Sequence, residues 1–118
     1  MERIEWITRA FAQSSTVQES LFPDFVNVAD ELAVEWELAL EDINEDLLSN
    51  EQRLSIKALD DYMLSISGPD NIQFWNNDAL YNSSEWNYMR VLAGNILTAM
   101  GWDDKPPSKS SAIYINNG

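Results

Sequence analysis

The sequence contains neither cysteine nor histidine among its 118 residues. Without cysteine, the chain can form no disulfide, no thiolate nucleophile and no cysteine-ligated zinc site. Without histidine, it lacks the side chain that most often serves as a general base and as a transition-metal ligand. A Ser-His-Asp mechanism is therefore excluded. We expect no catalytic residue, no cofactor and no bound metal.

Basic residues are scarce as well. Seven lysines and arginines face twenty aspartates and glutamates, which gives a formal net charge of −13 and a pI near 4.1. Such a charge repels the phosphate backbone of nucleic acids and the surface of anionic membranes. A basic protein is the complementary partner, since opposite potentials speed association and orient the two surfaces. The alternative is that the acidity only keeps the protein soluble.

Long apolar runs are also missing, and no segment approaches the roughly 18 apolar residues of a membrane span. The segment 10–12 (Ala-Phe-Ala) resembles a signal-peptide cleavage site. However, Glu2, Glu5 and Arg9 interrupt any apolar stretch before it, and no basic region precedes one. We therefore expect a cytoplasmic protein that begins at Met1.

Hydrophobic residues make up 45% of the chain and include five tryptophans, enough for the core of one domain. Apolar spacing typical of helices predicts four of them, at about residues 3–13, 23–48, 49–67 and 85–100. The expected core positions of the second are Phe25, Val28, Ala29, Leu32, Trp36, Ala39, Leu40, Ile43 and Leu47. Those of the third are Leu54, Ala58, Leu59, Tyr62, Met63 and Ile66.

Residues typical of helix ends support these boundaries. Ser49 followed by Gln52 matches a capping box, and Gly68 and Gly101 are suited to left-handed helix ends. Residues 78–81 could add a short helix, and 17–22 an extra turn. The prediction is an all-α, compact bundle of about four antiparallel helices in residues 1–102. Residues 103–118 are expected to form a mobile tail, with a short extended segment at 112–115.

Acidic residues dominate the middle of the chain. No lysine or arginine lies between Arg9 and Arg53, while that stretch holds eleven acids. They are Glu19, Asp24, Asp30, Glu31, Glu35, Glu37, Glu41, Asp42, Glu45, Asp46 and Glu51. Four like-charged pairs in it have helical i,i+4 spacing, at a cost of about 1–2 kcal/mol in total. A helix that needs only solubility would more often alternate its charges, so a binding function is indicated.

Two apolar residues lie among these acids. On a helical wheel, Val34 and Leu38 lie about 160° from Trp36, away from the core stripe. Apolar atoms ringed by like charges resemble the centre of an interface with a steering rim. The predicted partner surface consists of Glu31, Val34, Glu35, Leu38, Asp42 and Glu45. Coverage by another part of the chain, or contact between two copies of it, are the alternatives.

A second candidate surface is rich in aromatic and amide side chains, which suit protein recognition. Its members are Phe74, Trp75, Asn76, Asn77, Tyr81, Trp86 and Tyr88. Tryptophans in a small domain lie more often in the core than at an interface, so burial is the stronger expectation for Trp75 and Trp86, and most of all for Trp36. Trp6 and Trp102 fit either role.

An enzymatic alternative uses carboxylates and magnesium. Helical nucleotide pyrophosphohydrolases hold the metal with paired acids on facing helices. The nearest approximation here is Asp42 and Glu45, with Asp60 and Asp61 on the next helix. The full pattern is missing, and no basic cluster is available to hold a triphosphate. Binding is therefore preferred to catalysis.

The acid-rich stretch 30–46 and the segment 86–93 (Trp-Asn-Tyr-Met-Arg-Val-Leu-Ala) resemble the small acidic helical immunity proteins of bacterial toxin systems. These include the colicin and contact-dependent inhibition systems. The resemblance implies one-to-one neutralisation of a cognate toxin without catalysis. A basic, nuclease-like toxin whose active-site groove is blocked fits the charge. A phage-type DNA mimic and a non-inhibitory adaptor or assembly protein stay open as alternatives.

Overall fold

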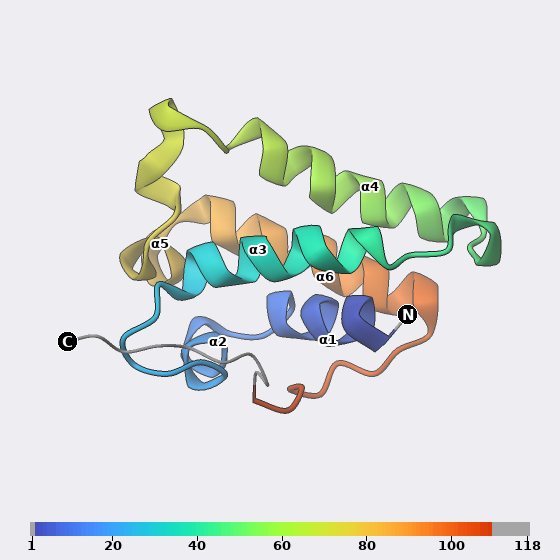
Figure 1. Cartoon of the computed structure of the whole chain (residues 1–118), viewed down its shortest axis with the longest axis horizontal. Coiled ribbons are helices and arrows are strands. Elements are labelled where there is room, and N and C mark those ends of the chain that lie inside the picture. Colours follow the sequence, from blue (N-terminus) through green and yellow to red (C-terminus); the bar gives the residue numbers. More distant parts are fainter. Residues whose placement is uncertain (1, 110–118) are drawn as a thin grey trace.

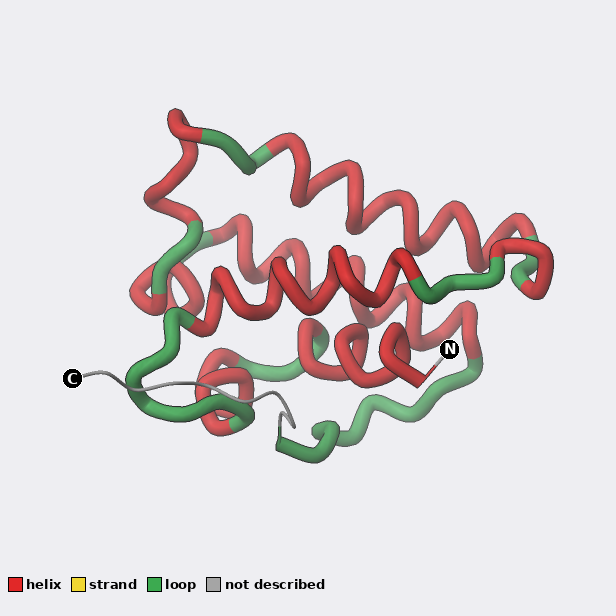
Figure 2. The backbone as a smooth tube through the Cα atoms, viewed as in Figure 1, coloured by secondary structure: helices red, strands yellow, loops and turns green. Residues whose placement is uncertain are grey.

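The computed structural model describes residues 2–109, which form helices joined by loops (Figures 1 and 2). In chain order the elements are α1 (Glu2–Phe11), α2 (Ser15–Ser20), α3 (Val28–Glu41), η1 (Glu45–Leu47), α4 (Asn50–Ser65), η2 (Pro69–Phe74), α5 (Asn77–Asn82) and α6 (Ser84–Met100). No strand occurs in this part of the chain, so the predicted all-α class is confirmed. The four longest helices match the four predicted from apolar spacing.

Helix α6 lies at the centre of the packing. It contacts α1 and α4 and, at one end, α5, while α1 also packs against α3 (Figure 1). The core is built around aromatic rings. Phe11 stacks on Trp86 with ring centroids 5.6 Å apart and meets Trp36 edge-on at 5.9 Å. Trp36 and Trp86 are fully buried, as expected for both.

The ends of α4 and α6 follow local sequence rules. Ser49 Oγ accepts the Gln52 N–H at 3.1 Å, and Gln52 Oε1 accepts the Ser49 N–H at 2.9 Å. The predicted capping box is therefore confirmed. Ser83 caps α6 by accepting the Trp86 N–H at 3.2 Å. Gly101 ends α6 in the left-handed region, with φ of +70°.

The two glycines of the last helix should respond oppositely to alanine. Gly94 lies inside α6 with open space around it, so Gly94→Ala should raise the free energy of unfolding by about 0.5 kcal/mol. Gly101→Ala forces a side chain into the left-handed region and should lower it by about 1 kcal/mol. Urea denaturation of both variants checks this, and shifts of the same sign would contradict it.

The second predicted helix is too long at both ends. Helix α3 begins at Val28 because Asn27 Oδ1 accepts the Asp30 N–H at 3.3 Å, and residues 23–26 form a turn instead. After Glu41 the chain leaves the helix, and Asn44 caps the separate turn η1. Phe25 and Leu47, predicted as core positions, are consequently 48% and 70% exposed.

The third predicted stripe is partly wrong. Leu54 is 66% exposed and Ala58 is exposed, whereas Ile56, Leu59 and Met63 carry the buried side of α4. The helix is turned so that this side faces α6, which leaves Leu54 toward solvent. Gly68 does adopt a positive φ, +97°, but it precedes η2 rather than capping α4.

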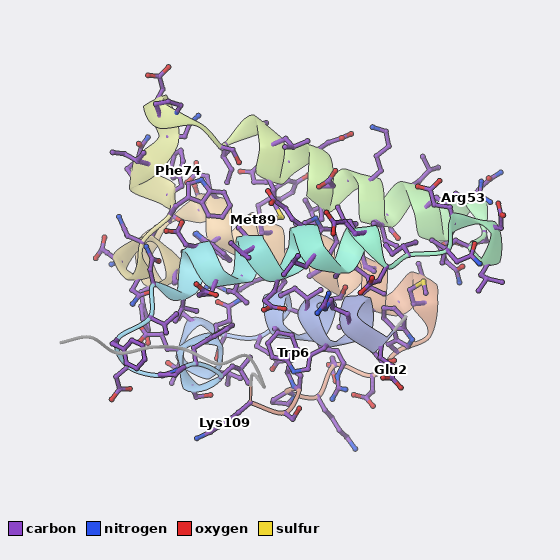
Figure 3. All side chains as sticks on the ribbon, viewed as in Figure 1. Glu2, Trp6, Arg53, Phe74, Met89 and Lys109 are labelled. Carbon is purple, nitrogen blue, oxygen red and sulfur yellow. The ribbon has the colours of Figure 1, made fainter. Side chains whose placement is uncertain are left out.

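The segment after α6 lies along α1. Trp6 Nε1 donates to the Ser108 carbonyl, and Arg9 Nε donates to that of Lys105, both at 2.9 Å (Figure 3). Gln13 Nε2 reaches the Asp104 carbonyl, also at 2.9 Å. Residues 103–118 were expected to form a mobile tail, so these contacts were not predicted from the sequence. The predicted extended segment at 112–115 lies outside the described residues.

Candidate partner-binding surface

The outer face of α3 carries exposed apolar side chains. Leu32, Trp36 and Ala39 are fully buried on the inner face, whereas Val34 is 46% and Leu38 37% exposed. The wheel therefore placed Val34 and Leu38 correctly, away from the core. Within residues 2–109, no other segment buries them. We call the surface formed by Glu31, Val34, Glu35 and Leu38 the α3 face.

The remaining two residues of the predicted surface lie at its edge or beyond it. Asp42 caps the end of α3, and its Oδ2 is 3.2 Å from Nη1 of Arg3 on α1. Glu45 belongs to η1, after the helix has ended, and lines a groove beside Arg53. The structure thus brings four of the six predicted residues together on one helix and separates Glu45 from them.

The carboxylates within α3 form no ion pair in the described part of the chain. Helix α3 contains Asp30, Glu31, Glu35, Glu37 and Glu41, and none of them forms an ion pair with a lysine or arginine of the described chain. Two of the four predicted repulsive pairs, Glu31/Glu35 and Glu37/Glu41, lie within the helix. The other two involve Glu45 and Asp46, which are outside α3, so their helical repulsion is absent.

A groove lies between α3 and α4 and was not predicted from the sequence. Its first half has a volume of about 350 Å³ and an apolar lining that includes Trp36, Met63 and Trp75. Three carboxylates also line it: Asp30 and Glu37 from α3, and Asp60 from α4. Asp30 and Glu37 are seven residues apart in the sequence, which places them on one side of α3. This spacing is the sequence feature from which the acidic side of the groove could have been predicted.

The second half of the groove contains cations as well as carboxylates. Its volume is about 380 Å³, and Arg53 and Lys57 line it together with Glu45, Asp60 and Asp61. Lys57 Nζ lies 2.7 Å from Asp61 Oδ2, and this hydrogen bond raises the pKa of Lys57. Arg53 marks this end of the molecule and Phe74 the opposite end (Figure 3).

The aromatic residues of the second predicted surface are divided among different places. Trp86 is fully buried, and its Nε1 donates to the Phe74 carbonyl at 2.7 Å. Trp75 lines the groove, and its Nε1 donates to the Ile66 carbonyl at 2.7 Å. Tyr88 is half-exposed and meets Tyr62 edge-on. These residues do not form one continuous surface. Trp6 and Trp102 are partly buried against the core.

Three of the four carboxylates considered for magnesium already have other partners. Asp42 pairs with Arg3 and Asp61 with Lys57, while Asp60 Oδ1 accepts the Trp36 indole N–H at 3.1 Å. Among residues 2–109, no cluster of three or more acids has an arrangement suited to a metal ion.

In the described part of the chain, every helix is too short or too polar to cross a membrane. The comparisons with protein-family models, curated proteins and solved structures found no match to this chain.

Proposed function

We propose that this chain is an acidic protein-binding inhibitor, and specifically an immunity protein that neutralises a basic, nuclease-like bacterial toxin. One observation carries the proposal: exposed Val34 and Leu38 lie on a helix whose carboxylates have no ion-pair partners within residues 2–109. A toxin that binds phosphate needs a basic groove. An inhibitor that covers this groove needs negative charge with an apolar anchor.

The two parts of the α3 face have different roles in this proposal. The unpaired carboxylates attract the basic partner over a distance and orient it during approach. Val34 and Leu38 then lose their water in the contact, at about 25 cal/mol for each Å² of apolar surface buried. A sugar-phosphate backbone has no counterpart to these aliphatic side chains. They therefore favour an inhibitor with its own contact surface over a simple mimic of DNA charge.

Reversing two charges on this face should slow the binding of the partner. We expect native protein, used as bait at low salt, to recover one basic protein that is released by high salt. The Glu31→Lys/Glu35→Lys variant should associate with it at least about tenfold more slowly, because electrostatic steering is lost. Its association rate should also depend less on salt. Stopped-flow or biosensor kinetics with the recovered protein measures both effects.

The control variant is Asp24→Lys/Glu51→Lys, which changes the net charge equally. Asp24 lies in the turn before α3, and Glu51 lies in the first turn of α4, as Glu31 does in α3. This control should bind nearly as fast as native protein. Equal slowing of both variants would show that only net charge matters and would reject the α3 face. Failure to recover any single basic protein would count against the inhibitor role.

A further inference from the structure

The half of the groove beside η2 combines an apolar lining with three carboxylates and no lysine or arginine. Trp36 and Met63 are buried there, while Leu64 and Ile72 on its rim are 65% and 71% exposed. Asp30, Glu37 and Asp60 supply its carboxylates, and no lysine or arginine lines it. The cavity therefore combines an apolar surface for an alkyl stem with acids for a cationic head.

All seven lysines and arginines of the sequence lie within residues 2–109, and none of them lines this half of the groove. Arg53 and Lys57 line the opposite half of the groove. Arg3 pairs with Asp42, and Arg9 is bonded to the segment that lies along α1. Arg90 is engaged with carbonyl groups in the core. Within residues 2–109, the charge of this half of the groove is left for another molecule to complement.

We propose that this half of the groove binds an arginine side chain of the basic partner, as a second anchor beside the α3 face. The proposal rests on the proposed function for the identity of the partner as a basic protein. The planar guanidinium can bond two carboxylate oxygens at once and is weakly hydrated, which suits a site walled by indole rings. A lysine ammonium is more strongly hydrated and loses more on leaving water. The site therefore prefers arginine.

The test uses a small probe, N-acetyl-arginine amide, followed by the indole N–H signals of ¹⁵N-labelled protein. The Trp36 N–H is bonded to Asp60, and the Trp75 ring lines the groove, so both signals report on the site. The Trp6 N–H is bonded to Ser108 and serves as an internal reference. At constant ionic strength, we expect saturable shifts at Trp36 and Trp75. N-acetyl-citrulline amide, which has the same shape without the charge, should cause none.

Paired variants locate the binding. Asp30→Asn/Glu37→Gln removes two carboxylates from the groove and should weaken probe binding about fivefold, since each exposed charge contributes a fraction of a kcal/mol. Glu31→Gln/Glu41→Gln removes two carboxylates from the same helix that do not line the groove. This control should leave the affinity within about twofold of native.

Three outcomes would overturn the proposal. The first is a shift that stays linear with probe concentration or that affects all five indoles equally, and the second is an equal loss of probe affinity in the two double variants. The third is a movement of the Trp36 and Trp75 signals when the protein is concentrated without probe. The last would mean that a second copy fills the groove. Because the probe is small, its binding should be retained in Glu31→Lys/Glu35→Lys. A groove that binds the probe while no basic partner is recovered would reject the proposed function and leave the arginine site standing.

Discussion

Replacing Arg90 with methionine should lower the free energy of unfolding by about 3 kcal/mol. The guanidinium links three separate segments to α6. Its Nε donates to the Gln13 carbonyl at 3.1 Å, and its Nη2 donates to Gln18 Oε1 at 2.9 Å and to the Leu80 carbonyl at 2.6 Å. Methionine keeps an apolar stem of similar length but leaves these acceptors without their donor.

Burial also lowers the pKa of the Arg90 guanidinium, and no carboxylate of the described chain forms an ion pair with it. Neutral acceptors alone therefore hold this charge. The matched control is Arg53→Met, since Arg53 is exposed and makes one hydrogen bond, to the Leu48 carbonyl. Urea unfolding should show a loss below about 1 kcal/mol for the control. Equal losses in the two variants would contradict a special role for Arg90.

The largest loss of stability is expected for Trp86→Ala, at about 4 kcal/mol. The Trp86 ring is fully buried, stacked on Phe11 and edge-on to Trp75 at 5.7 Å. Alanine removes the ring and leaves a cavity among three helices. It also removes the N–H that donates to the Phe74 carbonyl, and therefore the hydrogen bond that joins α6 to η2.

Thermal and urea denaturation measure this effect, and Tyr88→Ala on the same helix is the control. Tyr88 is 48% exposed and contacts Tyr62, so its loss should cost about 1 kcal/mol or less. Since Trp86→Ala could leave too little folded protein to measure, Trp86→Phe provides a milder version. Phenylalanine retains most of the ring contacts but not the N–H, and should lie between native protein and alanine. Native stability in Trp86→Phe would show that the hydrogen bond contributes nothing.

The features predicted correctly from the sequence depend on neighbours within one or two helical turns. The capping box at Ser49 needs only Gln52, and the end of α6 needs only a residue that tolerates a positive φ. The outward position of Val34 and Leu38 follows from helical spacing relative to Trp36. Such features need no knowledge of how the helices pack.

The boundaries of α3 show where this reasoning failed. Apolar spacing continued through residues 23–48, but the side chains of Asn27 and Asn44 bond nearby backbone N–H groups and start new elements there. An asparagine side chain competes with a continuing helix because it bonds backbone N–H groups itself. The prediction followed the apolar spacing and gave these asparagines too little weight. Phe25 and Leu47 were assigned to the core for the same reason.

The sequence could not show how the groove and the Arg90 cluster are assembled, because both bring together distant segments. Asp60 joins Asp30 and Glu37 only once α4 has packed on α6 and stands beside α3. The acceptors of Arg90 come from the loop after α1, from α2 and from α5. An arginine within an apolar helical stripe gives no indication of which carbonyl groups it will reach.

The packing of the first helices on α6 has a consequence during synthesis. Gln18 bonds Arg90, which lies 72 positions later, and Phe11 stacks on Trp86 of the same late helix. At about 5–20 residues per second, the first helices wait roughly 4–14 seconds for these partners to be translated. Nearly all of the stretch without lysine or arginine, residues 10–52, emerges during that interval. Mutual repulsion between such chains opposes their aggregation while the apolar side of α1 is still uncovered.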